Sequence, residues 1–315
     1  MARNLPAAGW SLGAVLVGCA GAAGPRGAAP PAHDPHVVVD HTVVVDGAAL
    51  VYHVVGRGPA CIVQPGGPGL DWSYLRLPAE LEEHLTLVYI EPAGTGASAP
   101  LPDGVAAGAT ADEARIDAVR ADLGLDSVYV LGHSYGGWVA MQYAIDHAEH
   151  LGGLVLYGTS AVRGEALDDD IEAVVGSFVD EPWFSDAQNA RFGLGDAPPH
   201  GNCPRLTAVA PFYFDDWTHR RAALEPLILA LRCWDLPRAH DLLDDYRPAL
   251  AGVTAPTLVI GGRRDWRFPI AWQRATADAL PHATFVVVEH SGHLPHVEQP
   301  ADFARAIIAW LPAAR

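Results

Sequence analysis

The stretch "YVLGHSYGGWVAMQYA" at residues 129–144 decides the fold. It places Ser134 in the order G-x-S-x-G between Gly132 and Gly136, and Gly137 follows directly. The β-branched and aromatic run before the serine predicts a strand, and the apolar residues after it recur at helical spacing. Glycine is needed where the backbone is left-handed or where another segment approaches closely. The pattern therefore predicts a sharp turn between strand and helix that exposes the hydroxyl of Ser134 as a nucleophile.

A nucleophilic serine needs a base to take its proton and an acid to orient that base. Asp265 follows the buried-strand pattern "PTLVIGG", and His293 follows the strand pattern "TFVVV". The chain order Ser134, Asp265, His293 is the one expected of an α/β-hydrolase. We therefore expect these three side chains to form a catalytic triad at one edge of a parallel sheet. The alternative is a glycine-rich turn with an idle serine, and His133 is interpreted as a packing residue of the turn.

An early strand at residues 61–63 is followed by the loop "PGGPG" at residues 65–69, which has few side-chain atoms to obstruct a carbonyl oxygen. Acyl transfer needs backbone N–H groups that stabilise the oxyanion of the tetrahedral intermediate. The N–H groups of Gly67 and Tyr135 are the predicted donors of this oxyanion hole. A glycine-proline turn without a function is the alternative.

Four segments together resemble the α/β-hydrolase superfamily, and within it the proline iminopeptidase-like branch. The segments are "PGGPG" at 65–69, "GHSYGG" at 132–137, "PTLVIGGRRD" at 256–265 and "SGHLPHVEQP" at 291–300. Pro65 stands where that family usually has histidine, and "EPAGTGAS" at 91–98 lacks the arginine of the related family segment. The resemblance implies a serine hydrolase, with an aminopeptidase acting on short peptides as the leading expectation.

Length and patterning predict one α/β-hydrolase core with an insertion. Strand and helix patterns alternate from about residue 85, which is typical of a mostly parallel sheet flanked by helices. The alternation stops at about residue 162 and resumes near residue 252. We therefore expect a core formed by residues 36–161 and 252–315, and a mainly helical cap at 162–251.

The predicted cap is acidic and rich in aromatic residues. From Arg163 to Arg247 the sequence has 16 Asp or Glu against 8 Arg and no Lys. A carboxylate in an aromatic site would bind the free ammonium of a peptide, which favours the aminopeptidase. A carboxylesterase is the alternative, and a non-catalytic surface-binding lipoprotein is a further one. Single cap acids such as Glu172, Glu181 and Glu225 are individually expected at the solvated surface.

The formal net charge of −17 argues against nucleic acid as a partner, because phosphate backbones attract basic surfaces. The proposed chemistry needs no cofactor, so a small molecule or short peptide is the expected partner; the oligomeric state stays open.

Two other site types fit parts of the sequence weakly. His290, His293 and His296 have a spacing that a metal could use, and residues 94–99 match G-x-G-x-x-A, a dinucleotide signature.

The N-terminal segment predicts export. Residues 1–18 have an early arginine and a modest apolar run, as in a signal peptide. "LVGC" at residues 16–19 resembles a bacterial lipobox, which makes Cys19 the predicted lipidation site. Residues 19–35 would then be a flexible linker to a membrane-anchored enzyme of the cell envelope. The alternative is a cytoplasmic protein with an uncleaved leader.

Three further cysteines have separate expectations. Cys61 falls in a predicted strand and should behave as a small buried hydrophobe. Cys203 and Cys233 both fall in the predicted cap, and in an oxidising compartment they would be able to form a disulfide.

Overall fold

The computed structural model describes residues 36–105, 108–194, 202–234 and 241–312, without the side chains of residues 202–204. In these residues one sheet has eight strands in the order β1-β2-β4-β3-β5-β6-β7-β8. β2 is antiparallel to both β1 and β4, whereas neighbouring strands from β4 to β8 are parallel. The strands are β1 (Val39–Val45), β2 (Ala48–Gly56), β3 (Ala60–Gln64), β4 (Thr86–Ile90), β5 (Val128–His133), β6 (Leu151–Tyr157), β7 (Thr257–Gly262) and β8 (Ala283–Val288).

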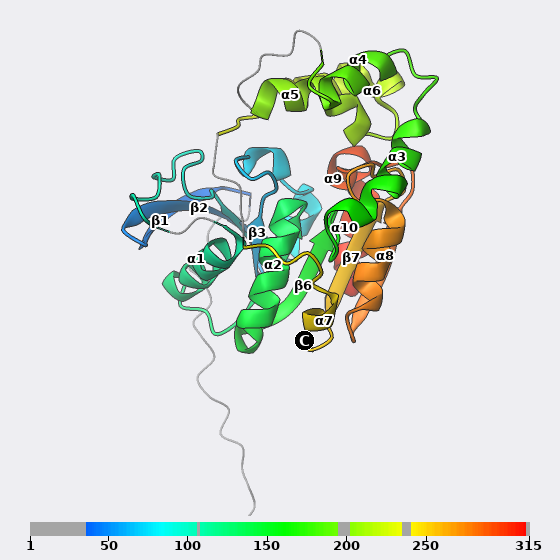
Figure 1. The fold of residues 1–315 in the computed structure, drawn as a ribbon. Coiled ribbons are helices and arrows are strands. Elements are labelled where there is room, and N and C mark those ends of the chain that lie inside the picture. The colour runs from blue at the N-terminus through cyan, green and yellow to red at the C-terminus, as the bar shows by residue number, and fades with distance from the viewer. Residues whose placement is uncertain (1–35, 106–107, 195–201, 235–240, 313–315) are drawn as a thin grey trace, which may run out of the picture.

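Helices cover both faces of this sheet (Figure 1). The inner strands consist mainly of apolar residues, and their alternate residues pack into two separate clusters, as expected of strands that are buried on both faces. Helices α1 (Ala109–Asp122), α2 (Tyr135–Asp146), α7 (Arg247–Leu250) and α8 (Ile270–Asp278) contribute to one cluster or adjoin it. Helix α10 (Pro300–Trp310) and the short helices η1 (Ser73–Leu75) and η2 (Ala79–Glu83) contribute to the other cluster.

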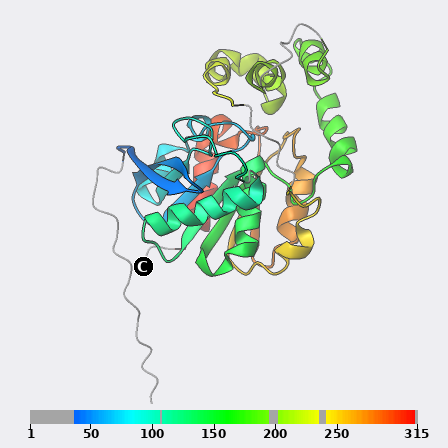
Figure 2. The same cartoon turned by 60° about the vertical axis from the view of Figure 1, so that its left-hand side comes forward.

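A helical layer inserted between β6 and β7 lies beyond the carboxyl ends of the parallel strands, at the top of Figure 1 and again in Figure 2. Its members are η4 (Glu165–Leu167), α3 (Asp168–Gly176), α4 (Phe184–Arg191), α5 (Asn202–Val209), η5 (Ala210–Tyr213) and α6 (Trp217–Leu229). It has its own apolar cluster, into which Trp266 and Phe268 of the loop after β7 also pack. The predicted α/β fold with a helical insertion is confirmed.

The two remaining short helices are η3 (Ala148–His150), before β6, and α9 (Pro295–Glu298), after β8. Tyr246 and Leu250 fall within the residues predicted as cap but pack in the main core cluster with α2. The sequence ranges assigned to core and cap stay predictions. No helix in the described residues combines the length and the apolar character required to cross a bilayer.

Candidate active site

Ser134 occupies the turn between β5 and α2 with φ 55° and ψ −121°, a conformation that residues with a side chain rarely adopt. The glycines around it have ordinary φ values, so they serve close approach instead. A Cβ on Gly132 would lie 2.3 Å from the carbonyl oxygen of Gly136. A Cβ on Gly136 would lie 2.3 Å from the carbonyl oxygen of Gln64, and one on Gly137 would collide with Thr159. The strained residue is therefore the serine itself, as in a nucleophile elbow.

Asp265 and His293 come together although 28 residues separate them. The Nδ1 atom of His293 lies 2.9 Å from Oδ2 of Asp265, and both side chains are buried. Oδ1 of Asp265 accepts the N–H groups of Arg267 and Phe268 at 2.9 and 3.0 Å. Oδ2 also accepts from the amide of Gln273 at 3.1 Å. With Nδ1 held as the donor, Nε2 of His293 is left to act as a base.

The residues of the predicted site line a cavity of about 820 Å³. Ser134, His293 and Gly67 all line it. The hydroxyl of Ser134 has no hydrogen-bond partner in the residues that the structure describes. Catalytic hydrogen bonds are commonly long before substrate binds and tighten in the complex. The arrangement therefore allows His293 to take the serine proton once a substrate excludes water from the cavity.

The two predicted oxyanion donors belong to the loop after β3 and to the start of α2. Gly67 lines the cavity with φ +123°, and Tyr135 is the first residue of α2, where backbone N–H groups have no partner in the helix. Within the described residues neither N–H donates to another protein group. The side chain of Tyr135 is turned elsewhere, because its hydroxyl donates to Asp112 at 3.1 Å. The role of both N–H groups stays a prediction.

A buried chain of hydrogen bonds connects the oxyanion loop with the loop of His293. The N–H of Gly66 donates to the hydroxyl of Tyr74 at 2.6 Å, and that hydroxyl lies 2.9 Å from Nδ1 of His133. Nε2 of His133 lies 3.2 Å from the carbonyl oxygen of His293. Burial lowers the pKa of His133 well below that of an ordinary histidine, so the ring is neutral and can accept at Nδ1 while donating from Nε2.

Sequence patterns identified His133 as a packing residue but gave no signal for Tyr74. The neighbouring His296 is buried as well, and Nε2 of its ring lies 3.0 Å from the backbone carbonyl of Tyr74. Burial lowers the pKa of His296 to about 4.

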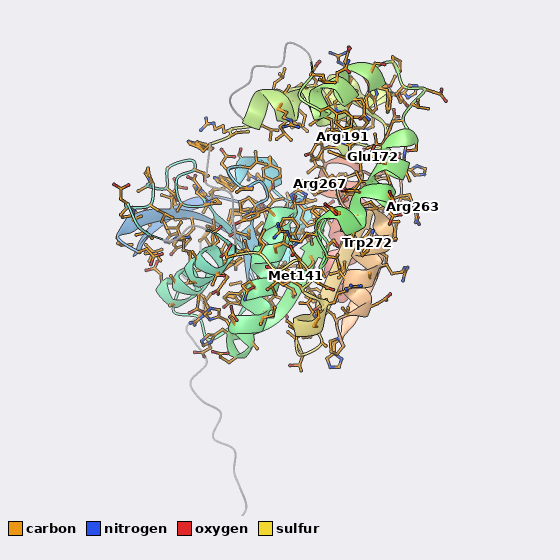
Figure 3. All side chains as sticks on the ribbon, in the orientation of Figure 1. Met141, Glu172, Arg191, Arg263, Arg267 and Trp272 are labelled. Carbon is orange, nitrogen blue, oxygen red and sulfur yellow. The ribbon has the colours of Figure 1, made fainter. Side chains whose placement is uncertain are left out.

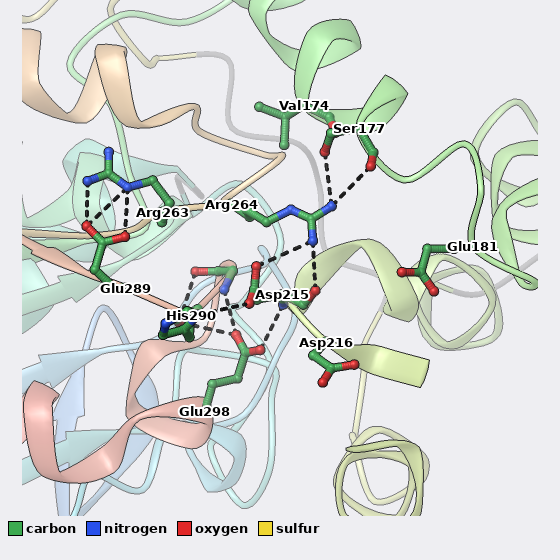
Figure 4. A network of polar contacts seen from close by, with 12 residues as sticks. Val174, Ser177, Glu181, Asp215, Asp216, Arg263, Arg264, Glu289, His290 and Glu298 are labelled. Carbon is green, nitrogen blue, oxygen red and sulfur yellow. Dashed lines mark hydrogen bonds and ion pairs between the residues drawn. The ribbon is translucent and has the colours of Figure 1, made fainter. Parts of the chain in front are cut away.

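The helical layer is tied to the loops of Asp265 and His293 by the polar network in Figure 4. Arg264 donates to the carbonyl oxygen of Asp215 at 3.1 Å and to both oxygens of Ser177 at 3.1 and 3.2 Å. Glu298 accepts the N–H groups of Gly292 at 2.6 Å and of Asp215 at 2.8 Å. Burial raises the pKa of Glu298 to about 7. The network fixes the cap against the two loops that carry the acid and the base.

The metal and dinucleotide interpretations gain no support. His290 is exposed while His293 and His296 are buried in different contacts, and the described residues contain no group of three or more side chains that could hold a metal. The helix that a dinucleotide site requires directly after residues 94–99 is not formed, because α1 begins only at Ala109.

The cysteines differ in their state. Cys61 is buried and free as expected, and burial raises the pKa of its thiol to about 12. Cys233 is disulfide-bonded. The side chain of Cys203 lies outside the described part of the chain, so its pairing with Cys233 stays a prediction. Cys19, the signal peptide and the linker also lie outside the described residues.

The expected carboxylate for a substrate ammonium is not found in the described lining of the cavity, which contains neither Asp nor Glu. The cap acids named above have other environments. Glu172 is half-exposed and pairs with Arg191, and Glu225 is exposed and pairs with Arg221. Glu181 accepts a hydrogen bond from Thr218 at the surface. Expecting these three at the surface was therefore right, and the described lining of the cavity offers no carboxylate for a substrate ammonium.

Comparison with known proteins agrees with this geometry. A family model described as alpha/beta hydrolase fold matches residues 59–300. Proline iminopeptidase PfmaB of Pestalotiopsis fici is 28% identical over 268 residues, which cover 82% of this chain and 94% of that protein. The pimeloyl-[acyl-carrier protein] methyl ester esterase of Shewanella oneidensis is 27% identical over 270 residues, covering 83% and 94%. The solved structure of proline iminopeptidase from Mycobacterium smegmatis has a TM-score of 0.66 at 21% identity, covering 86% and 97%, a likeness of fold alone.

Proposed function

Because the chain belongs to the α/β-hydrolase family and is a hydrolase, we propose that it cleaves carboxylic esters through a covalent acyl-enzyme on Ser134. The observation that carries the proposal is the buried pair of Asp265 and His293, 2.9 Å apart, beside a cavity that Ser134 also lines. A base held in one tautomer beside the cavity that a strained serine lines is the arrangement that activates a hydroxyl nucleophile.

The reaction has two halves. Oγ of Ser134 attacks the carbonyl carbon of the ester while Nε2 of His293 takes its proton, and the N–H groups of Gly67 and Tyr135 stabilise the oxyanion. As the intermediate collapses, the bond to the alcohol breaks, and the alcohol leaves with the proton from His293. Water then adds to the acyl-enzyme with His293 again as base, and the carboxylic acid departs as Ser134 regains its proton. Asp265 keeps the imidazole oriented and stabilises its positive charge.

The cavity favours an ester over a peptide. An aminopeptidase must bind the ammonium of its substrate, and a buried ammonium without a carboxylate partner is costly. The described lining has no carboxylate and four arginines, which repel an ammonium. The aminopeptidase remains the second candidate because proline iminopeptidases are among the relatives, at 28% identity.

A fluorophosphonate probe tests the mechanism. We expect the wild-type protein to be labelled at Ser134 and the Ser134→Ala variant to lose both labelling and turnover of 4-nitrophenyl esters, while its circular dichroism stays unchanged. A panel of 4-nitrophenyl esters and aminoacyl 4-nitroanilides then separates the candidates. Labelling at another residue, or full activity of Ser134→Ala, rejects the mechanism. Turnover of the prolyl anilide with no turnover of esters replaces the esterase by the aminopeptidase.

A further inference from the structure

The cavity beside Ser134 carries positive charge in a protein that is strongly acidic. The whole sequence has 37 Asp or Glu against 20 Lys or Arg. Among the described residues that line the cavity, however, there are four arginines and no carboxylate: Arg76, Arg191, Arg205 and Arg267. Figure 3 labels Arg191 in the cap and Arg267 in the loop that follows β7, so the charge comes from both layers.

Two of these arginines, Arg205 and Arg267, form no ion pair with a carboxylate in the part of the chain that the structure describes. Arg76 lies 3.7 Å from Glu82, and Arg191 forms an ion pair with Glu172. No ion pair of Arg205 or Arg267 exists within the described residues. Arg205 donates a hydrogen bond to the carbonyl oxygen of Arg191, which orients its guanidinium without cancelling its charge. Among the described residues, these two guanidinium groups are therefore the candidates to bind an anionic ligand at the cavity.

These charges lie close to the reacting groups. Arg267 is two residues from Asp265 in the same loop. Tyr213 packs edge-on against His293 at 5.3 Å and against Trp266 at 5.6 Å. Burial raises the pKa of the Tyr213 hydroxyl; the charge of Arg267 opposes that rise, the carboxylate of Asp265 adds to it, and the charge of Arg205 opposes it. Both arginines thus act electrostatically on a residue that contacts the catalytic histidine.

A buried donor accompanies them. Trp266 lines the cavity and is 7% exposed, and its indole N–H has no acceptor within the described residues. A buried donor without an acceptor is unfavourable. Trp266 thus adds a buried donor, without a partner in the described part of the chain, to the wall that Arg205 and Arg267 also line.

Much of the remaining cavity wall is apolar. Its aliphatic side chains come from α5, α6, the loop of His293 and α9, namely Leu206, Val209, Leu227, Ile228, Leu294 and Val297. Such a wall is suited to a hydrocarbon chain, whose burial is favourable by roughly 0.8 kcal/mol for each methylene group. The cavity therefore combines apolar side chains with four arginines, two of which form no ion pair within the described residues.

We propose that the substrate is an ester with an apolar chain that also bears an oxyanion, a carboxylate or a phosphate, bound by Arg205 and Arg267. The proposal rests on the esterase function proposed above and narrows its substrate class. Guanidinium groups match both oxyanions, since each presents two parallel N–H donors.

The test compares esters that differ only in charge. Mono-4-nitrophenyl esters of dicarboxylic acids of increasing length are assayed against the same compounds with the free carboxylate capped as a methyl ester. We expect kcat/KM of the wild-type enzyme to favour the charged member of each pair by roughly tenfold or more at the optimal length, the scale of a charge-assisted hydrogen bond. Alkyl phosphates and alkyl carboxylates of matched length, tested as competitive inhibitors, show which oxyanion is preferred.

Three variants assign the effect. Arg205→Gln and Arg267→Gln should each lower the charged-to-neutral ratio of kcat/KM by roughly tenfold, and Arg267→Lys should restore part of it. The control is Arg274→Gln, because Arg274 is an exposed arginine of α8 that packs on Phe285 away from the cavity; its ratio should equal that of the wild type.

A charged-to-neutral ratio of kcat/KM of one or below in the wild-type enzyme would overturn the proposal of an anionic substrate. Equal ratios in the wild type and all variants would overturn it as well. If neutral esters are still hydrolysed through Ser134 in these cases, the proposed esterase function stands. If neither member of a pair is hydrolysed and Ser134 is not labelled, the proposed function itself is wrong.

Discussion

Among single residues, Asp265 has the most completely defined surroundings. Each of its two oxygens accepts two hydrogen bonds. Oδ1 accepts from the N–H groups of Arg267 and Phe268, and Oδ2 accepts from the amide of Gln273 and from His293. No oxygen is left to face solvent or a substrate. In the proposed mechanism the carboxylate therefore orients the imidazole and stabilises its positive charge.

This geometry predicts the effect of Asp265→Asn. If the amide oxygen keeps the two backbone N–H groups, the amide nitrogen replaces Oδ2 and faces the side chain of Gln273 and the ring of His293. Nδ1 of His293 then becomes an acceptor and Nε2 carries the proton, so the ring cannot act as base. We expect kcat for a 4-nitrophenyl ester to fall by about four orders of magnitude, with KM little changed. A loss below tenfold would show that another group orients His293.

For single residues, the sequence predicted those site residues that belong to a motif or follow a strand. It missed the residues that reach the site only through the packing of distant elements. Asp265 and His293 each follow an apolar strand, and their contact is now observed. Tyr74, Gln273 and Arg267 belong to no motif. Their contacts depend on the packing of η1, α8 and the loop after β7, which periodicity does not encode.

Among the elements, the loop at residues 65–69 and the turn at Ser134 are packed with almost no free space. A Cβ on Gly66 would lie 2.9 Å from Cβ of Ser134, 3.0 Å from the hydroxyl of Tyr74 and 3.1 Å from the carbonyl oxygen of His133. The loop that carries Gly67 is therefore positioned by direct contact with the nucleophile.

Gly66→Ala should move this loop away from Ser134 and weaken the oxyanion hole. We expect kcat/KM for esters to fall by roughly a hundredfold, the scale of one lost oxyanion donor. The free energy of unfolding should fall by only about 1 to 3 kcal/mol, since overpacking is local. Gly176→Ala is the matched control, because a Cβ there would meet nothing within 4 Å. Equal activity of the two variants would show that the loop does not contribute to catalysis.

The elements also show why the acidic composition of the cap places no carboxylate in the described lining of the cavity. Composition correctly described the cap as acidic, yet a helix turns some of its residues outward and others inward. Glu172 and Glu225 lie on outward positions of α3 and α6, whereas Leu206 of α5 and Ile228 of α6 line the cavity. Which face of each helix covers the core depends on the packing of four helices, and a charge count contains no such information.

At the scale of the whole molecule, buried histidines make stability depend on pH. His133 and His296 are both neutral in the folded state, because burial lowers their pKa values, that of His296 to about 4. The unfolded chain takes up protons on these residues below about pH 6.5. Their contribution to stability is therefore complete above that pH and is lost as the pH falls. Glu298 acts in the opposite direction. Its pKa is raised to about 7 in the folded state, so folding favours the protonated carboxyl, and its contribution to stability grows as the pH falls below about 7.

His296→Gln isolates one of these contributions, because an amide can still donate to the carbonyl of Tyr74 and has no proton to gain. Between pH 7 and pH 4.5 we expect the free energy of unfolding of the wild type to fall by about 2 to 3 kcal/mol more than that of the variant. Urea unfolding at a series of pH values measures the difference. Parallel curves for the two proteins would mean that His296 is also protonated in the folded state.

The last prediction concerns where the molecule resides. We propose that Cys19 is lipidated and that residues 19–35 tether the catalytic domain to a membrane of the cell envelope. Cys233, far from Cys19 in sequence, is disulfide-bonded, and disulfides persist mainly in oxidising compartments outside the cytoplasm. Two independent features thus favour export, and a lipid anchor at the N-terminus would leave the cavity open to amphipathic esters near the membrane surface.

Cys19→Ser should release the enzyme from the membrane fraction of a bacterium that processes lipoproteins, because one or more acyl chains provide the anchoring energy. The wild-type protein should pellet with membranes, carry a mass consistent with loss of residues 1–18 and gain of lipid, and return to the soluble fraction when detergent is added. Cys61→Ser is the matched control, because Cys61 is a free, buried cysteine within β3 and its replacement leaves the anchor in place. A soluble wild-type protein that still contains residues 1–18 would contradict the anchor and would place the enzyme in the cytoplasm.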